Sequence, residues 1–495
     1  MIITEDTPAS PVKATTPLLP NTANGASGSA PPPAYSARQP GAPSPPGPIY
    51  YQAVYPTPNA MQSPPPEPTW KRFAKAFVVA VLIWSLFGAL VRSMSEKSFI
   101  GRGASYPIPP EVSTNRCVSQ WGLSEVTRNP PFSTYAYAAT KTFKFPVPDA
   151  TLLLLSKGAL SAGRLHVSAG TGDEVQVRVT VDYDEKTVRD LAKICMVERE
   201  AGEAGLGIFT PKYWRTYGRF PRLFFRVELV LPRGVSHVNA LETDVSNFAH
   251  DVDLFAGLIE FGTLNLGGSN GDIHTQSVRA GNVSLTTSNG KIVADRLVAP
   301  TIKLKSSNSQ ISGQFVASES FNLETSNGRV TVELTMNSDD PSVAKKVSIY
   351  TSNHELDAQI KLSTPSGSGG IFPIDVVTSN GKLSAKILSA PIDTTLRVNA
   401  RTSNALAVLE LPATYEGTFE VATSNAATAV HQANTDVPDP KCRRGGGRSC
   451  GRSRQLVTRM HSKGRFAGSV YWDRENEARG EVVLKSSNGP ADIYL

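Results

Sequence analysis

Cysteine is scarce in this sequence, with four residues among 495. Four are too few for a disulfide-stapled scaffold, and they show no CxxC spacing, which argues against a structural zinc site. The seven histidines are scattered and include no HExxH pair. No GxSxG, P-loop or GxGxxG motif stands in a strand–turn–helix context. The sequence therefore predicts no metal and no organic cofactor.

Charged residues are nearly missing from residues 1–70, which hold five of them but 18 of the 37 prolines. Proline runs favour extended polyproline II, and a segment without apolar periodicity cannot build a core, so we predict a disordered tail. Within it, Pro32, Pro33 and Tyr35 form a PPxY sequence that resembles the ligands of WW domains. A WW-domain protein is therefore an expected partner, with a chance match in a proline-rich segment as the alternative.

An uncharged run, Ala76–Val91, follows three basic residues and precedes Arg92. Counted from Phe73, the helix would be about 28 Å long, close to the thickness of a hydrocarbon core. Its apolar residues lie on every face, which argues against an ordinary core helix. We predict one transmembrane helix over 71–93, in a lipid bilayer. The excess of basic residues before it favours a cytoplasmic tail and an extracellular or luminal C-terminal part, reached through a connector over 94–135.

Acidic residues are missing from residues 441–465, which carry nine lysines and arginines. Without these nine charges the net charge falls from +7 to −2, so the protein is near neutral apart from one basic segment. We predict a Gly/Arg-rich loop insertion over 433–465, which Cys442 and Cys450 could close, leaving the other two cysteines as candidates for a second pair. Since no aromatic residue interleaves within its Gly/Arg run to stack bases, no nucleic acid is expected. Anionic glycans or wall polymers are the expected partners.

The dipeptide Ser-Asn occurs ten times from Asn247 onward. Three successive spacings are 19 residues, and the others are 21 to 27 apart from a gap of 63 that contains the basic segment. A period near 20 predicts a repeat architecture. The predicted corner residues are Asn270, Asn289, Asn308, Asn327, Asn353, Asn380, Asn404, Asn425 and Asn488.

Conserved spacing within the repeats defines columns around each Asn. All ten residues six positions earlier and nine of the ten four positions earlier are apolar, and Thr or Ser usually stands two positions earlier. This period of two places the columns and the Asn on one inward strand face. Gly follows Asn in five of ten repeats, and both tolerate the positive φ of a tight corner. We predict a mainly β protein: a parallel β-solenoid over 236–495 after a β-rich leading section over 136–235. A β-sandwich of hairpins would explain the short strands but not the columns.

The Thr-Ser-Asn-Gly turns, the Val227–Pro232 run before them and the anchored layout resemble the putative-adhesin domains of unknown function. These occur in bacteria, with a related version in fungal membrane proteins. The resemblance covers roughly 140–495, and the corners at Asn404 and Asn425 depart from it by lacking Gly. It implies a β-solenoid without agreed catalytic residues, and therefore a non-catalytic task in surface adhesion, glycan contact or structure.

Two other functions compete with this one. A wall-polysaccharide hydrolase or lyase would need clustered carboxylates, for which Asp251, Asp253 and Asp272 are the candidates. A membrane-trafficking adaptor would work through the PPxY-bearing tail. In addition, Asn282 begins a glycosylation sequon, and it is expected to point outward because its neighbour Val283 belongs to an apolar column.

Overall fold

The computed structural model describes residues 77–79, 81–87, 105–121, 126–127, 135–213, 222–254, 259–432, 438–442 and 452–495. The chain divides into two units, Met1–Glu96 and Lys97–Leu495. The predicted tail over 1–70, with its Pro32, Pro33 and Tyr35, lies outside the described residues.

The predicted membrane segment is described only in part. Residues 77–79 and 81–87 are helical, and their apolar side chains are exposed, Trp84 at 81%. Within the described ranges, no helix combines the length and the apolar character needed to cross a bilayer. The transmembrane helix over 71–93 therefore stays a prediction.

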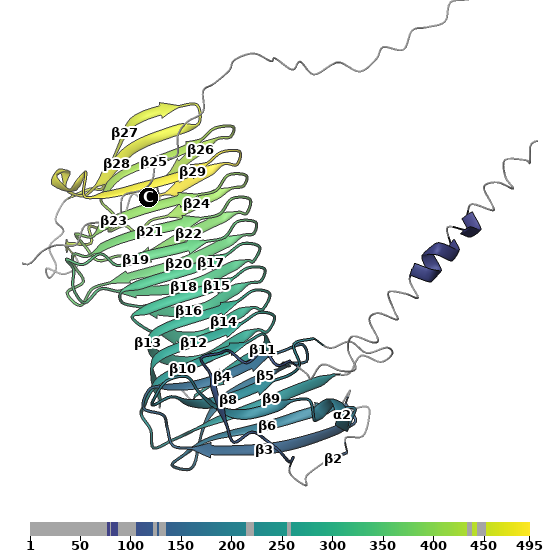
Figure 1. Ribbon diagram of the computed structural model, residues 1–495. Coiled ribbons are helices and arrows are strands. Elements are labelled where there is room, and N and C mark those ends of the chain that lie inside the picture. The colour runs from purple at the N-terminus through teal and green to yellow at the C-terminus, as the bar shows by residue number, and fades with distance from the viewer. Residues whose placement is uncertain are drawn as a thin grey trace, which may run out of the picture. The chain divides into compact units, whose positions relative to one another are not determined.

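The second unit is mainly β, as predicted, and most of it is a stack of two-stranded rungs (Figure 1). Corresponding strands of successive rungs pair in parallel and in register, so that Leu285, Leu304 and Leu323 lie side by side. The first ladder contains β10 (His237–Val245), β12 (Glu260–Gly268), the end of β13 (Ile273–Thr287), β15 (Thr301–Ser306), β17 (Ser320–Thr325), β19 (Lys346–Tyr350), β21 (Ile371–Val377) and β23 (Thr395–Arg401).

The second ladder forms the other side of each rung. It contains β11 (Asn247–Asp253), the start of β13, β14 (Ile292–Val298), β16 (Ile311–Ala317), β18 (Val330–Asn337), β20 (Leu356–Ser363), β22 (Leu383–Ser389) and β24 (Ala407–Glu410). Inward side chains of both ladders belong to one continuous apolar core. The long parallel sheet is thus solenoid-like, because each ladder pairs a strand with the strand one turn later.

The leading section extends the same two ladders and closes them with antiparallel strands. On the second ladder, β5 (Ala162–Gly170) is followed by β9 (Leu223–Pro232), β6 (Val175–Tyr183) and β3 (Tyr137–Phe145). On the first ladder, β4 (Thr151–Lys157) is followed by β8 (Ala204–Phe209), β7 (Lys193–Glu198) and β1 (Ser113–Asn115). Two short elements complete this end: β2 (Val126–Thr127) and α2 (Lys186–Arg189).

The opposite end of the stack does not follow chain order. β29 (Gly480–Ser486) pairs with both β23 and β25 (Gly417–Thr423), and β30 (Ala491–Tyr494) lies between β24 and β26 (Thr428–His431). The last strands of the chain therefore form the penultimate rung, inserted between the rungs of Asn404 and Asn425. This insertion explains the gap of 63 residues in the repeat.

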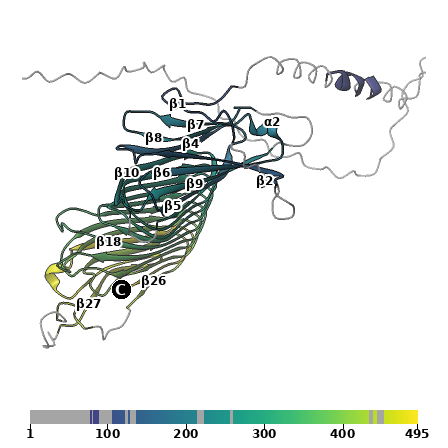
Figure 2. The same cartoon turned by 90° about the horizontal axis from the view of Figure 1, so that it is seen from below.

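A hairpin covers the last rung. β28 (Arg465–Tyr471) pairs antiparallel with β25, and β27 (Gln455–Ser462) pairs with β28. The basic segment expected as a loop over 433–465 thus includes the strand β27. We refer to residues 411–495 as the C-terminal cap. Figure 2 shows the cap and the leading section at opposite ends of the stack.

The corner Asn side chains are exposed, so the prediction that they face inward is wrong. Around Asn289, the inward residue is Thr287, whose exposed fraction is 1%. Its hydroxyl accepts from the Gly290 amide at 3.2 Å and donates to the Gly271 carbonyl at 3.2 Å. The strand ends at this hydroxyl, and the turn that follows rotates the Asn outward. The alternation of inward and outward residues therefore stops two positions before the Asn.

The prediction that the corner glycines adopt a positive φ is also wrong. Gly271, Gly290, Gly328, Gly381 and Gly489 are not among the described residues with positive φ. Glycine is needed there because a Cβ on Gly290 would lie 1.8 Å from the Gly271 carbonyl oxygen. In spatial order the residues at this position are Phe248, Gly271, Gly290, Ser309, Gly328, His354, Gly381, Ala405, Gly489 and Ala426, so no two neighbouring corners both carry a side chain here.

Candidate functional site

The corner asparagines form a ladder of side-chain hydrogen bonds along the outside of the stack. Each Nδ2 donates to the Oδ1 of the preceding rung, in nine bonds of 2.5 to 2.8 Å. The ladder runs from Asn247 to Asn404, then to Asn488 and finally to Asn425. These side chains bond to each other and point away from the core, which gives them a structural role.

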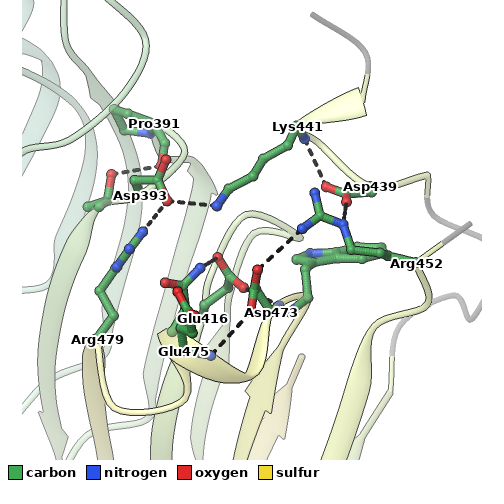
Figure 3. Close-up of polar contacts among 12 residues, drawn as sticks. Pro391, Asp393, Glu416, Asp439, Lys441, Arg452, Asp473, Glu475 and Arg479 are labelled. Carbon is green, nitrogen blue, oxygen red and sulfur yellow. Dashed lines mark hydrogen bonds and ion pairs between the residues drawn. The ribbon is translucent and has the colours of Figure 1, made fainter. Parts of the chain in front are cut away.

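Ion pairs join the two ends of the basic segment to Asp393 in the regular region and to acids elsewhere in the cap (Figure 3). The Lys441 ammonium lies 2.8 Å from a carboxylate oxygen of Asp393, which also accepts from Arg479. On the other side, Arg452 lies 2.9 Å from Asp439 and 3.4 Å from Asp473. Among the described cations of residues 441–465, four are paired with acids outside this segment: Lys441, Arg452, Arg459 and Arg465. Part of the positive charge of this segment is therefore neutralised by ion pairs that stabilise the cap.

Asp393 shows how the environment favours these pairs. Its burial favours the neutral acid, but the hydrogen bonds from Lys441 and Arg479 outweigh burial and lower its pKa. Asp393 also has a φ of 59°. The carboxylate therefore sits at a bend of the chain and joins two segments that are distant in sequence.

Glu416 is the buried anchor of the cap, with 4% of its surface exposed. Its Oε1 accepts from the backbone amides of Trp472 at 2.8 Å and Asp473 at 2.9 Å, and its Oε2 accepts from Asn476 at 2.8 Å. One carboxylate thus satisfies three donors in the segment that leads from β28 to β29. No pattern around Glu416 in the sequence indicated this role.

Arg454 and Tyr415 lie beside this anchor. Burial lowers the pKa of Arg454 to about 10, against the opposing charge of Glu416. Its guanidinium donates to the Tyr415 carbonyl at 3.0 Å. Burial raises the pKa of the Tyr415 hydroxyl, which donates to the Thr418 carbonyl at 2.5 Å. Both groups therefore have structural partners.

A groove of about 680 Å³ opens where the regular rungs meet the cap. Its charged lining residues are Arg401, Arg465, Lys485 and Glu420. Hydroxyl groups supply much of the rest of the lining: Thr378, Ser379, Thr402, Ser403, Thr423, Ser424, Ser486 and Ser487. We call this hollow the corner groove. It is polar and open, and it combines cations with hydrogen-bonding groups.

The candidate acids lie elsewhere. The Asp251 carboxylate lies 3.3 Å from His166 and 3.3 Å from His274, on the outward face of the second ladder. The Asp272 carboxylate accepts from the Lys291 amide at 2.7 Å and so supports a corner. Asp251, Asp253 and Asp272 are absent from the described lining of the corner groove. Among the described residues, no three His, Cys, Asp or Glu side chains are grouped so as to hold a metal ion.

The remaining candidates are placed as follows. Asn282 is exposed in β13, between Thr263 and Thr301 of neighbouring strands. Cys117 and Cys195, the second candidate pair, form a disulfide. Cys442 is also disulfide-bonded, but Cys450 lies outside the described residues, so their pairing stays a prediction.

Residues 163–402 match the family model described as Toastrack DUF4097. The match runs from β5 to the residue after β23. This chain carries a Toastrack DUF4097 domain. The Toastrack domain thus includes leading strands and the regular rungs up to β23, whereas β24 and the C-terminal cap lie beyond it. It is an adhesin-type domain of unknown function.

Solved structures of low identity also match. They include a "putative cell adhesion protein" of Clostridium sporogenes, at 11% identity over 72% of this chain and 99% of that chain, with a TM-score of 0.15. A "putative adhesin" of Parabacteroides merdae matches at 13% identity over 52% and 96% of the two chains, with a TM-score of 0.23. Scores this low carry no argument about function. No curated protein matches the chain.

Proposed function

We propose that this chain is a single-pass membrane protein whose Toastrack domain and cap stand outside the cell or in a lumen and bind anionic surface polymers without catalysis. One observation carries the proposal. The described part of the second unit begins at residue 105, beside the leading section, and the cation-rich cap closes the opposite end of the rung stack. Within the second unit, the cap is therefore at the end of the stack opposite to the one where the described chain enters it.

The stack suits a spacer. About ten rungs at roughly 4.8 Å give a length of about 45 Å. Antiparallel strands cover both ends, at β3 and at β28. Covered ends remove most of the exposed parallel edges through which such stacks would otherwise associate. An unassociated stack leaves the tip free for contact with another surface.

The competing functions have less support. An enzyme would need paired carboxylates facing a substrate groove, but Asp251 and Asp272 are hydrogen-bonded outside the corner groove. The trafficking alternative depends on Pro32, Pro33 and Tyr35, which are outside the described residues, so it stays a prediction.

The topology is tested with full-length protein that carries one epitope tag at each end, expressed in its host cells. We expect a membrane-impermeant label to reach the C-terminal tag in intact cells and the N-terminal tag only after permeabilisation. The reverse pattern would contradict the orientation, and release of the protein by carbonate would contradict the anchor.

The contact function is tested with the same full-length protein in nanodiscs and isolated cell walls. We expect saturable retention that weakens as the salt concentration rises, because charge pairs at a surface are screened. A variant with Arg443, Arg444 and Arg448 replaced by Gln measures how much of this retention depends on the basic segment. No retention of the wild type at micromolar concentration would reject the function.

A further inference from the structure

The corner groove spans four successive strands, three of which carry a cation in the same row. Arg401 of β23 is in register with Lys485 of β29, Lys485 with Ala422 of β25, and Ala422 with Arg465 of β28. The small Ala422 leaves a hollow between Lys485 and Arg465. Arg401 and Lys485 each stand three positions before a corner Asn, an offset at which side chains point outward. Arg465 lies opposite Ala422, which has the same offset, and therefore points to the same face.

One acid lies among the three cations. Glu420 is 3.5 Å from Lys485 and 3.3 Å from Arg465, and its side chain is 25% exposed. The lysine and arginine side chains are more exposed, at 43% and 49%. Three cations against one carboxylate leave an excess of positive charge in the groove. An anionic ligand is therefore favoured over a cationic or neutral one.

Four serine hydroxyls line one wall of the groove, one from each successive corner: Ser379, Ser403, Ser487 and Ser424. Their backbone amides are already used, since Ser403 donates to Ser379, Ser487 to Ser403 and Ser424 to Ser487, at 2.9 to 3.2 Å. Their hydroxyls have no side-chain hydrogen bond within the described part of the chain. They repeat at about 4.8 Å, the spacing of strands in a sheet.

This lining indicates the chemistry of a ligand. The lining residues that the structure describes include no aromatic side chain on which a sugar ring or a base could stack. Recognition must then come from charge-assisted hydrogen bonds by Arg401, Lys485 and Arg465 and from the row of hydroxyls. A chain with an anionic group and several hydroxyls on each unit offers both kinds of partner.

We propose that the corner groove binds an acidic polysaccharide, a sugar chain that carries carboxylate or sulfate groups. The inference rests on the proposed function and gives it a site. The groove also depends on the inserted rung, because β29 supplies Lys485 and Ser486 and the corner after it supplies Ser487. The ligand therefore binds only to a chain whose C-terminal strands are in place.

The test measures binding of full-length protein in nanodiscs to polygalacturonate, heparin and neutral dextran, by biolayer interferometry at constant salt. The groove variant is R401Q/K485Q. The matched control is K303Q/K346Q, which removes two exposed cations from the same outward face several rungs away. We expect binding to at least one acidic polymer, a loss of at least about tenfold in the groove variant and little change in the control.

The outcomes separate the groove from the proposed function. Binding to polygalacturonate alone or to heparin alone identifies the carboxylate or the sulfate as the anionic group. Equal affinity of the groove variant and the wild type would overturn the site, and equal binding of dextran would overturn recognition by charge. If the wild type is retained on cell walls but binds neither acidic polymer, the inference fails and the proposed function stands. Unchanged thermal unfolding of R401Q/K485Q shows that any loss reflects binding.

Discussion

The regular rungs and the C-terminal cap are held together by different kinds of contact. Between Asn270 and Asn404, the same apolar, hydroxyl and amide columns repeat at every rung. In the cap, single contacts join segments far apart in sequence, as Glu416 does with Trp472 and as Arg479 of the cap does with Asp393, which lies just before β23. A repeated contact spreads its stabilisation over many rungs, whereas a single contact concentrates it. The two regions should therefore respond differently to loss of one side chain.

The largest expected effect comes from Glu416 in the cap. Replacing it with Ala leaves two backbone amides and Asn476 without their acceptor, and it removes the negative charge that favours the buried cation of Arg454. We expect a loss of about 4 kcal/mol in the free energy of unfolding of the cap. The measurement is native-state hydrogen exchange, with protection lost over residues 465–495 and kept in the central rungs.

The matched control for this variant is Glu324→Ala in a central rung. Glu324 forms an ion pair of 3.1 Å with Lys305, and about half of its side chain is exposed. Such a pair contributes about 0.5 kcal/mol or less. If the two variants lost the same stability, or if Glu416→Ala opened the central rungs first, the contrast between the regions would be wrong.

The next largest effect tests the close approach at the corners. Gly290→Ala places a Cβ against the backbone carbonyl of Gly271, which cannot move as a flexible side chain would. We expect destabilisation of about 3 kcal/mol by overpacking, measured by denaturant unfolding. Gly234→Ala is the control, since a Cβ there meets no atom within 4 Å. A neutral Gly290→Ala would refute the steric account of the corner glycines.

The first rung contains a buried titratable side chain, whereas the interior of the later rungs is mainly apolar, so its stability should depend on pH. His250 is buried, and burial lowers its pKa to about 4. The Thr243 hydroxyl accepts from the Gly267 amide and forms a hydrogen bond of 2.8 Å with His250 Nε2. In the unfolded chain histidine takes up a proton near pH 6.5, whereas the folded protein does not until about pH 4. Stability should thus be complete above pH 6.5 and fall as the pH drops toward 4.

The expected loss is about 2 kcal/mol between pH 7.5 and pH 5, measured by chemical unfolding at each pH. His250→Leu should flatten this slope, since it removes the titrating group. His237→Asn, at an exposed position of β10, should leave the slope unchanged. An unaltered slope in His250→Leu would show that other groups cause the acid sensitivity.

Much of the regular region could be predicted from the sequence, because a columnar period of two specifies which residues face inward. The columns of Leu285 and Thr287 indicated parallel strands and a shared core. The outward turn of Asn289 could not be read from them, since periodicity says nothing about where a strand ends. The hydrogen bond from Gly290 to the Thr287 hydroxyl decides that point.

The cap could not be predicted because its contacts do not repeat. Nothing local to Glu416 or Asp393 indicates partners 60 or 86 residues away. One signal for the inserted rung was present all the same. Ala405 and Ala426 follow successive corner asparagines, and two neighbouring side chains at that position would break the pattern of the other corners. Inserting Gly489 between them restores it.

The smallest expected effect concerns the amide ladder, and it tests whether a corner Asn contributes the same stability in the regular rungs as in the cap. Asn308 makes two side-chain bonds, of 2.7 and 2.8 Å, to its neighbours in sequence order. Asn488 makes two bonds, of 2.6 and 2.7 Å, to residues 84 and 63 positions away. Since all of these amides are exposed, water replaces most of each bond, and either Ala variant should cost about 1 kcal/mol.

If spatial order alone matters, Asn308→Ala and Asn488→Ala should destabilise their own rungs equally in hydrogen exchange. A double-mutant cycle between Asn404 and Asn488 should then give the same coupling as one between Asn289 and Asn308, whereas Asn289 and Asn380 should be additive within about 0.5 kcal/mol. A much larger effect at Asn488 would mean that the inserted rung relies on its amide bonds more than the regular rungs do. The amide bonds of Asn488 would then act like the single contacts of the cap, because the inserted strands have no direct covalent link to either neighbouring rung.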